Sequence, residues 1–204
     1  FEIKNKNKIR KFKSIKKKYK NNKIKKLASY FNKSKNPIFV IGNGIKQSKT
    51  KNNFFKLVKK HSVPFFTSRF AYDLFPFSNK YNLGLLGIKG QPYSREILDK
   101  TDLLIFLGCR AAPTVYLDKV KKNKKLKKVI IDIDTQSLNH PLTNFNLKIN
   151  YDLKDFFKVF TRENKNKISF KNWNNFCQKI KNKNEIKLIK NNKDPIDLYR
   201  FMFD

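Results

Sequence analysis

The chain has little cysteine, arginine and glycine, and it has no long apolar run. Its 204 residues include two cysteines, Cys109 and Cys177, which stand far apart without a framework spacing. A disulfide scaffold and a cysteine-ligated metal cluster are therefore excluded, and a reducing, cytoplasmic setting is indicated. The sequence contains no apolar stretch long enough to cross a bilayer and no signal-type segment, so it predicts neither membrane insertion nor secretion.

Arginine is scarce although the formal net charge is +33. Only six of the 48 basic residues are arginine, whereas proteins that read nucleic acid rely on the planar guanidinium group. The lysines occur together with asparagine, isoleucine and phenylalanine along the whole chain, which favours compositional drift over a selected polyanion site. A nucleic-acid partner is therefore not expected. A stand-alone basic nucleic-acid-binding module stays an alternative, as does the product of a split or decayed gene.

All six glycines lie between positions 42 and 108, in turns after apolar runs or in the segment 84–90. Glycines at strand ends let the backbone approach a ligand closely, as it approaches a pyrophosphate at a helix N-terminus. The simpler alternative is that they only form tight turns between strands and helices. The dinucleotide fingerprint requires a third glycine where this chain has Gln47, so a standard nicotinamide-binding fold is disfavoured.

Short apolar runs alternate with stretches of helical period. The run 37–41 leads directly into Gly42, the pattern of a strand that is buried on both faces and ends in a tight turn. The alternation predicts an α/β fold with a mostly parallel sheet and helices on both faces. Further strands are predicted at 63–67, 102–108, 129–134 and 147–150, and helices at 22–34, 47–61, 94–100, 152–160 and 173–180, while 68–83 is expected to be irregular.

One domain is predicted at 34–163, with connecting arms at 1–33 and 164–204. The arms are rich in lysine and asparagine and carry too little apolar surface to form a core of their own. The first residue is Phe1, and the last residues lie inside an amphipathic pattern. We therefore expect the chain to be a piece of a longer protein.

Five segments follow one another in an order and spacing that resemble a known family: 36–44, 63–67, 83–91, 102–110 and 130–134. Together they resemble the central domain of thiamine-diphosphate-dependent enzymes, in particular the acetolactate synthase-like branch. The resemblance implies a six-stranded, Rossmann-like parallel sheet lying between two other domains. The arm 1–33 would then be the linker and helix arriving from an N-terminal pyrimidine-binding domain. The arm 164–204 would lead to a C-terminal diphosphate-binding domain.

The resemblance also implies an activity for the intact enzyme. It would join or cleave carbon–carbon bonds of 2-oxo acids, as a transferase or lyase, with thiamine diphosphate and Mg2+ held by the flanking domains. The family's activating glutamate and its Gly-Asp-Gly magnesium motif are absent from these 204 residues. This piece alone is therefore expected to be inactive, and the intact protein is expected to be a homodimer or homotetramer.

In this family the central domain holds FAD, ADP or no nucleotide, and all three options stay open here. Arg110, directly after a buried strand, suits a phosphate because its charge is fixed and it can form paired hydrogen bonds. The alternative is an ordinary ion pair with an aspartate. The Ala-Ala-Pro sequence at 111–113 replaces polar residues that flavin-binding members often carry, which disfavours FAD. The positions that match nucleotide-contacting segments are Gly42, Asn43, Gly44, Gly87, Lys89, Gly90, Gly108, Arg110, Asp132 and Asp134.

Four further residues are candidates for chemistry. His61 and His140 are lone histidines without partners at ligand spacing, so neither a catalytic nor a metal role is expected. Asp132 and Asp134 alternate along a predicted strand and are expected to point to opposite faces. They would then not form a general acid/base pair, and Asp134, at the strand end, is the expected ligand contact.

Overall fold

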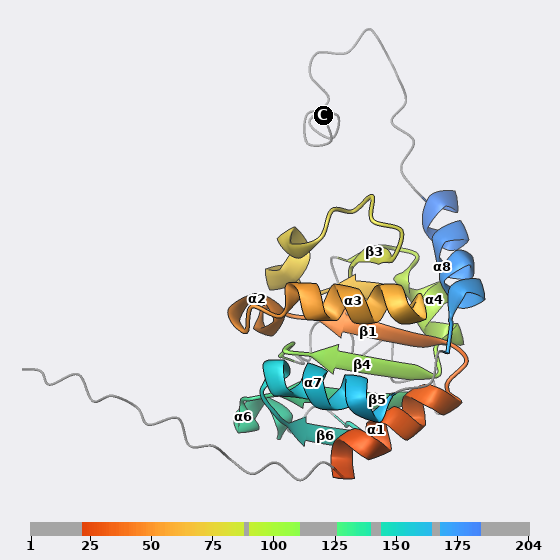
Figure 1. Ribbon diagram of the computed structural model, residues 1–204. Helices are drawn as coiled ribbons and strands as arrows, with labels where there is room; N and C mark the ends of the chain where they lie inside the picture. The colour runs from red at the N-terminus through yellow and green to blue at the C-terminus, as the bar shows by residue number, and fades with distance from the viewer. Residues whose placement is uncertain (1–21, 88–89, 111–125, 140–143, 165–167, 185–204) are drawn as a thin grey trace, which may run out of the picture.

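Six parallel strands form one sheet in the middle of the fold (Figure 1). The computed structural model describes residues 22–87, 90–110, 126–139, 144–164 and 168–184. The strands pair in the order β3-β2-β1-β4-β5-β6, and every pair is parallel. In chain order they are β1 (Pro37–Ile41), β2 (Phe65–Thr67), β3 (Asn82–Leu85), β4 (Leu103–Leu107), β5 (Lys127–Asp132) and β6 (Leu147–Asn150). The predicted α/β fold with a six-stranded parallel sheet is confirmed.

The two central strands are apolar throughout, because each is covered on both faces. Every residue of β1 and β4 is buried, and the two strands pair along their full length, from Pro37 with Leu103 to Ile41 with Leu107. From β1 the chain builds outward to β2 and β3, and then returns to the other side of β1 with β4. The strand order thus reverses between β1 and β4. In open α/β sheets, ligands bind outside the carboxyl ends of the strands at such a point.

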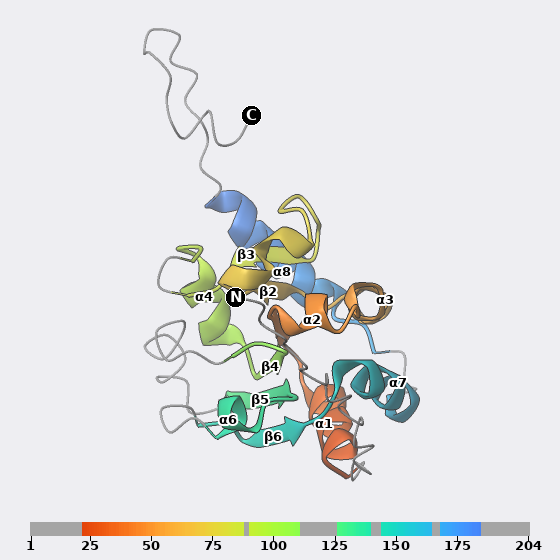
Figure 2. The same ribbon diagram turned by 90° about the vertical axis from the view of Figure 1, so that its left-hand side faces the viewer.

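Helices cover both faces of the sheet. Figure 2 shows α1, α3 and α7 on one side and α4 on the other. Helix α8 contacts β3 and stands at the right of Figure 1, on the side from which the strands begin. The helices are α1 (Asn22–Lys33), α2 (Gly44–Gln47), α3 (Lys51–His61), α4 (Ser94–Lys100), α6 (Thr135–Leu138), α7 (Leu153–Glu163) and α8 (Lys171–Lys183), with a 3-10 helix η1 (Arg69–Leu74).

Aromatic rings fill the core between the sheet and the helices α1, α3 and α7. Phe31 of α1 is fully buried, and its ring centroid lies 5.2 to 6.0 Å from those of four other rings. These neighbours are Phe39, His61, Phe160 and Phe170. Helix α1 is therefore part of the folded unit, because the Phe31 side chain lies at the centre of this aromatic cluster.

Helix α8 packs through its single tryptophan. The side chain of Trp173 is buried, and its indole N–H donates to the carbonyl oxygen of Pro37 at 3.0 Å. The ring also stacks on Phe176, with centroids 5.4 Å apart. The helix predicted around 173–180 is thus present and is joined to the first residue of β1.

Strands β2 and β5 differ from the prediction at their ends, helix α6 was not predicted, and two further elements differ more. The helix expected over 47–61 is divided, because Lys49 adopts a left-handed backbone conformation (φ 56°) between α2 and α3. Strand β3 was not predicted, since 68–83 was expected to be irregular. Its four residues include Gly84 at φ 81°, and its pairing with β2 shifts register within three residues. A strand this short, with glycine inside it, carries little of the apolar signal on which a prediction depends.

Candidate functional site

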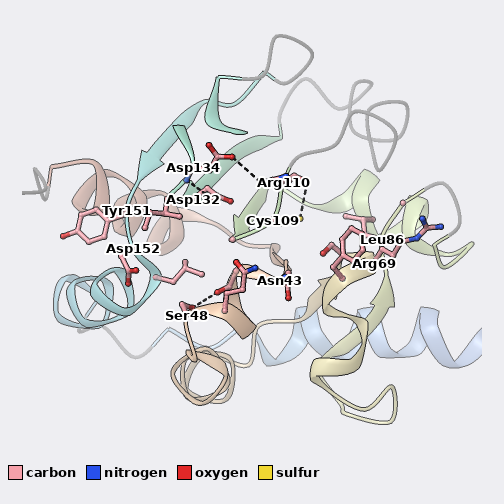
Figure 3. Close-up of a pocket in the computed structure, with 18 of the residues that line it drawn as sticks. Asn43, Ser48, Arg69, Leu86, Cys109, Arg110, Asp132, Asp134, Tyr151 and Asp152 are labelled. Carbon is pink, nitrogen blue, oxygen red and sulfur yellow. Dashed lines mark hydrogen bonds and ion pairs between the residues drawn. The ribbon is translucent and has the colours of Figure 1, made fainter. Parts of the chain in front are cut away.

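A cleft of about 940 Å³ opens at the carboxyl edge of the sheet, around the point where the strand order reverses (Figure 3). Residues that follow all six strands line it. They include Asn43 and Gly44 after β1, Arg69 and Phe70 after β2, Leu86 and Gly87 after β3, Cys109 and Arg110 after β4, Asp134 after β5, and Tyr151 and Asp152 after β6. A cavity of this size at this position is typical of a small-molecule or cofactor site.

Three glycines bring two turns beneath the cleft into direct contact. A Cβ on Gly42 would lie 2.2 Å from the carbonyl oxygen of Gly108, and one on Gly44 would lie 2.6 Å from Gly108 Cα. Their N–H groups are used inside the protein: Gly42 donates to Leu107, Gly44 to Gly108, and Gly108 to Ile131. These glycines are therefore required by packing between the ends of β1 and β4. The tight-turn alternative accounts for them, and their N–H groups are not available to a phosphate.

Two aspartates meet where β5 ends. Asp132 is the last residue of β5 and is 8% exposed, and the backbone N–H of Asp134 donates to its Oδ1 at 2.9 Å. Asp134 caps α6, where its carboxylate accepts from the N–H of Gln136 and the hydroxyl of Ser137. The expectation that the two aspartates point to opposite faces is wrong. Residues two apart along a strand share a face, so the alternation does not separate them; β5 ends at Asp132, and both residues line the cleft.

The two carboxyl groups have different pKa values for different reasons. Burial raises the pKa of Asp132, while the hydrogen bond from the Asp134 N–H acts in the other direction. The hydrogen bonds from Ser137 and Gln136 lower the pKa of Asp134. This side of the cleft thus offers carboxyl oxygens as acceptors to hydroxyl or amino groups of a ligand.

Two arginines border the same cleft. The Arg110 guanidinium lies 3.8 Å from Asp134 Oδ2, and its side chain is 84% exposed. Arg110 thus forms the ion pair with an aspartate that was the alternative to phosphate binding. Because this pair is exposed to solvent, it contributes little to stability. Arg69, at the start of η1, lies on the opposite side of the cavity from Asp132 and Asp134 in Figure 3, and its guanidinium group points away from them. Both guanidinium groups remain accessible to an anionic part of a ligand.

The structure brings together most of the residues predicted for the site. Gly42 lies beneath the cleft and does not line it, while Lys89 and residues 111–113 lie outside the described residues. The other eight predicted residues all line the cleft: Asn43, Gly44, Gly87, Gly90, Gly108, Arg110, Asp132 and Asp134. That they bind a nucleotide stays a prediction.

Sequence reasoning missed several lining residues. Arg69, Phe70, Ile133, Tyr151 and Asp152 all line the cleft, and Phe70 and Ile133 are 75% and 64% exposed. Each follows β2, β5 or β6 within four residues. Their position directly after a buried strand could have identified them as candidate site residues. The sequence analysis used this criterion only for strands that end in glycine or an acidic residue.

The cleft differs in composition from the rest of the chain. Lysine is the commonest residue type in the sequence, yet no lysine occurs among the described residues that line the cleft. The charged side chains there are the arginines Arg69 and Arg110 and the aspartates Asp132, Asp134 and Asp152. The lysine-rich character of the chain therefore does not extend into its described lining.

Cys109 lines the cleft but is not suited to nucleophilic chemistry. Its side chain is buried, and burial raises the pKa of its thiol to about 12. The nearby Asp132 carboxyl acts in the same direction, whereas a hydrogen bond with Ser68 opposes it. Because only a thiolate is an effective nucleophile, Cys109 behaves as a small packed side chain. Cys177 is buried as well, and burial raises its pKa too.

His61 has a structural role. Its Nδ1 donates to the carbonyl oxygen of Ile168 at 2.7 Å, which leaves Nε2 to accept from the Asn164 amide at 3.4 Å. It does not line the cleft, and burial lowers the pKa of its ring, with the Ile168 hydrogen bond opposing this and Lys60 adding to it. That His61 has no catalytic or metal role stays a prediction; these contacts show that both ring nitrogens have partners inside the protein. His140 lies outside the described residues.

The lowered pKa of His61 predicts a loss of stability in weak acid. Below a pH of about 6.5 the unfolded chain takes up a proton on His61 that the folded chain does not, so the free energy of unfolding falls. The loss ends once folded His61 also protonates. Denaturant unfolding at about pH 7.5 and pH 5.5 will measure it. His61→Gln should be less stable at the higher pH but lose less on acidification; an equal loss in both proteins would contradict the lowered pKa.

The described ranges offer neither a metal-binding cluster nor a membrane-spanning helix. These contain no group of three or more histidine, cysteine, aspartate or glutamate side chains placed to hold a metal ion. No helix within them is long and apolar enough to cross a membrane.

The strand order, the parallel pairing and the cleft at the reversal point define a Rossmann-like α/β domain. Residues 24–159 match the family model described as "Thiamine pyrophosphate enzyme, central domain". The chain therefore belongs to the family of thiamine pyrophosphate enzyme central domains.

Curated relatives include proteins named as acetolactate synthases and one named as a hydrolase. The chain is 27% identical over 160 residues to the acetolactate synthase large subunit of Lactococcus lactis, which covers 78% of this chain and 28% of that protein. It is 26% identical over 169 residues to the probable acetolactate synthase large subunit of Methanococcus aeolicus, with 80% and 28% covered. A 3D-(3,5/4)-trihydroxycyclohexane-1,2-dione hydrolase of Geobacillus thermodenitrificans is 30% identical over 76 residues, 37% of this chain and 12% of that protein. The chain spans less than a third of the length of these relatives.

Proposed function

We propose that this chain is the central domain of a thiamine-diphosphate-dependent enzyme that acts on 2-oxo acids in the manner of an acetolactate synthase, by carboligation or decarboxylation. The family match over 24–159 carries the proposal, and the names of the relatives support it. The domain predicted at 34–163, together with α1 and α8 that pack on it, would lie between a pyrimidine-binding domain reached through 1–33 and a diphosphate-binding domain reached through 164–204. The intact enzyme would be a cytoplasmic homodimer or homotetramer.

Thiamine diphosphate and Mg2+ do not fit the described part of this chain. The diphosphate of that cofactor is held through a divalent ion in the family, and the described residues include no cluster of carboxylate or histidine side chains that could ligate one. In the intact enzyme the cofactor would supply stabilisation of a carbanion next to the substrate carbonyl. Both groups are therefore assigned to the flanking domains, and the chain alone is proposed to be inactive.

The cleft fits a ligand with an adenosine diphosphate moiety, which ADP and FAD share. Asp132 and Asp134 at the end of β5 offer carboxyl oxygens to ribose hydroxyls, and an acidic group at a strand end serves this purpose in related sheets. Arg69 and Arg110 are exposed, and the solvated ion pair of Arg110 with Asp134 can exchange for a contact with the diphosphate. The phosphates would contact these guanidinium groups, because the N–H groups of Gly42, Gly44 and Gly108 already donate to backbone carbonyls.

Thermal unfolding of the 204-residue chain with ADP, FAD, or thiamine diphosphate plus Mg2+ tests this proposal. A ligand at 100 times its dissociation constant stabilises the folded state by about 2.7 kcal/mol, which raises the Tm of a chain of this size by about 5 to 10 °C. ADP or FAD should give such a shift, and thiamine diphosphate should give none. If neither nucleotide shifts the Tm, the cleft is not a nucleotide site. A shift with FAD but not ADP would require contacts to the flavin as well.

A pair of matched variants locates the nucleotide. Asp132→Asn keeps the shape of a cleft side chain, while Asp155→Asn makes the same change on α7, where the carboxylate pairs with Lys158 in solvent. The nucleotide-induced shift in Tm should fall clearly in the first variant and stay unchanged in the second. Equal shifts in both variants would exclude Asp132 as a ligand contact.

A further inference from the structure

Helix α8 lies beyond the segment that matches the family, which ends at residue 159, yet it packs closely on the domain. Trp173, Cys177 and Ile180 form its buried apolar stripe. The same buried face carries two polar residues, Asn174 and Lys181, which are 5% and 4% exposed. Burying an ammonium group costs free energy unless partners replace its water. The position of Lys181 therefore points to a specific contact.

Lys181 holds the chain that leads into β3. Its Nζ donates to the carbonyl oxygens of Phe77 and Asn82, and it lies 3.7 Å from the centroid of the Phe77 ring. Carbonyl dipoles and an aromatic face both attract a cation. Seven residues earlier on the same face, the amide of Asn174 donates to the carbonyl oxygen of Lys80 at 3.1 Å. Side chains of α8 thus reach three carbonyl groups within the segment 77–82.

This segment determines where β3 lies. Strand β3 is at the edge of the sheet and pairs only with β2, through a register that shifts between Phe65 and Thr67. A short edge strand with an irregular ladder is weakly held by its own pairing. Directly after β3, Leu86 and Gly87 form one wall of the cleft. A change in the backbone path of 77–82 would therefore also move Leu86 and Gly87, which follow only a few residues later.

We propose that α8 acts as a clamp that positions this wall of the cleft, with Lys181 and Asn174 as its positioning residues. The clamp holds 77–82, and through β3 it fixes the residues that face the ligand. Its effect on ligand affinity rests on the proposed nucleotide function. Because coupling between two sites is reciprocal, a nucleotide that orders the wall tightens the docking of α8 by the same factor. The cleft is in this way linked to the part of the chain that follows the central domain.

The test compares Lys181→Met with Lys179→Met in the full 204-residue chain. Both changes remove one positive charge and keep an unbranched side chain, but Lys179 is exposed on the same helix. Amide hydrogen exchange without any ligand is measured first. In Lys181→Met the peptides covering 77–87 should exchange about ten-fold faster, while those covering β1 and β4 stay unchanged. Lys179→Met should match the wild type everywhere.

Affinity for ADP is then measured by titration, well below the Tm of each protein. Lys181→Met should bind several-fold more weakly and Lys179→Met as the wild type does. Unchanged exchange at 77–87, or a uniform rise over the whole domain, would overturn the clamp. Local exchange with unchanged ADP affinity would overturn its link to the cleft. If the wild type does not bind ADP, the proposed function fails, and the exchange data still decide whether α8 holds the wall.

Discussion

Gly42→Ala is expected to destabilise the domain by at least about 3 kcal/mol, or to prevent folding. The added methyl group would lie 2.2 Å from the Gly108 carbonyl oxygen and 2.4 Å from Cys109 Cα. Both are backbone atoms at the end of β4, so relief requires the two central strands to move apart. Urea unfolding monitored by circular dichroism will measure the loss as a lower transition midpoint.

The matched control for Gly42 is Gly84→Ala. Gly84 has a positive φ of 81°, so alanine is strained there, but its Cβ would meet only side-chain atoms of Phe77 and Gln91. These side chains can rotate away, and a loss of about 1 to 2 kcal/mol is expected. If both variants lose the same stability, contact between the β1 and β4 turns is not what requires glycine at position 42.

Phe31→Ala is expected to cost about 3 to 5 kcal/mol, the range for a fully buried aromatic side chain. The ring contacts residues of β1, α3 and α7, so its removal leaves a cavity between α1 and the rest of the core. Chemical denaturation will measure the effect. Phe70→Ala is the control, because that ring is 75% exposed, and it should change stability by less than about 0.5 kcal/mol. A small effect at Phe31 would mean that α1 is dispensable for folding.

The central part of the fold could be predicted because it depends on local pattern. The run Pro37–Ile41 is buried on both faces, and a strand of this kind must be apolar at every position. The helix predicted to start at residue 152 is present as α7, and the carboxylate of Asp152, its N-cap, accepts from the Lys154 N–H at 2.7 Å. In both cases the residues that carry the signal are neighbours in sequence, so the pattern is complete without knowledge of the tertiary structure.

The parts that could not be predicted depend on contacts between distant segments. Strand β3 is short and is held by α8, whose Lys181 is about a hundred residues away in sequence. Asp132 and Asp134 were assigned to opposite faces in error, because residues two apart along a strand share a face; the predicted strand also ran two residues past Asp132, where β5 ends. Arg69 was missed although the predicted strand 63–67 ends where β2 ends, because residues after a strand were considered as site residues only where the strand ends in glycine or acid.

Trp173 gives the molecule a built-in spectroscopic reporter. It is the only tryptophan in the chain, and it sits on α8, where its indole stacks on Phe176 and donates to Pro37. Its emission maximum will therefore move to longer wavelength when α8 leaves the sheet, because the buried indole becomes hydrated. Emission reports this one helix, whereas far-ultraviolet circular dichroism averages over all of them. A fluorescence transition that precedes the dichroism transition would identify undocking of α8 as a separate step.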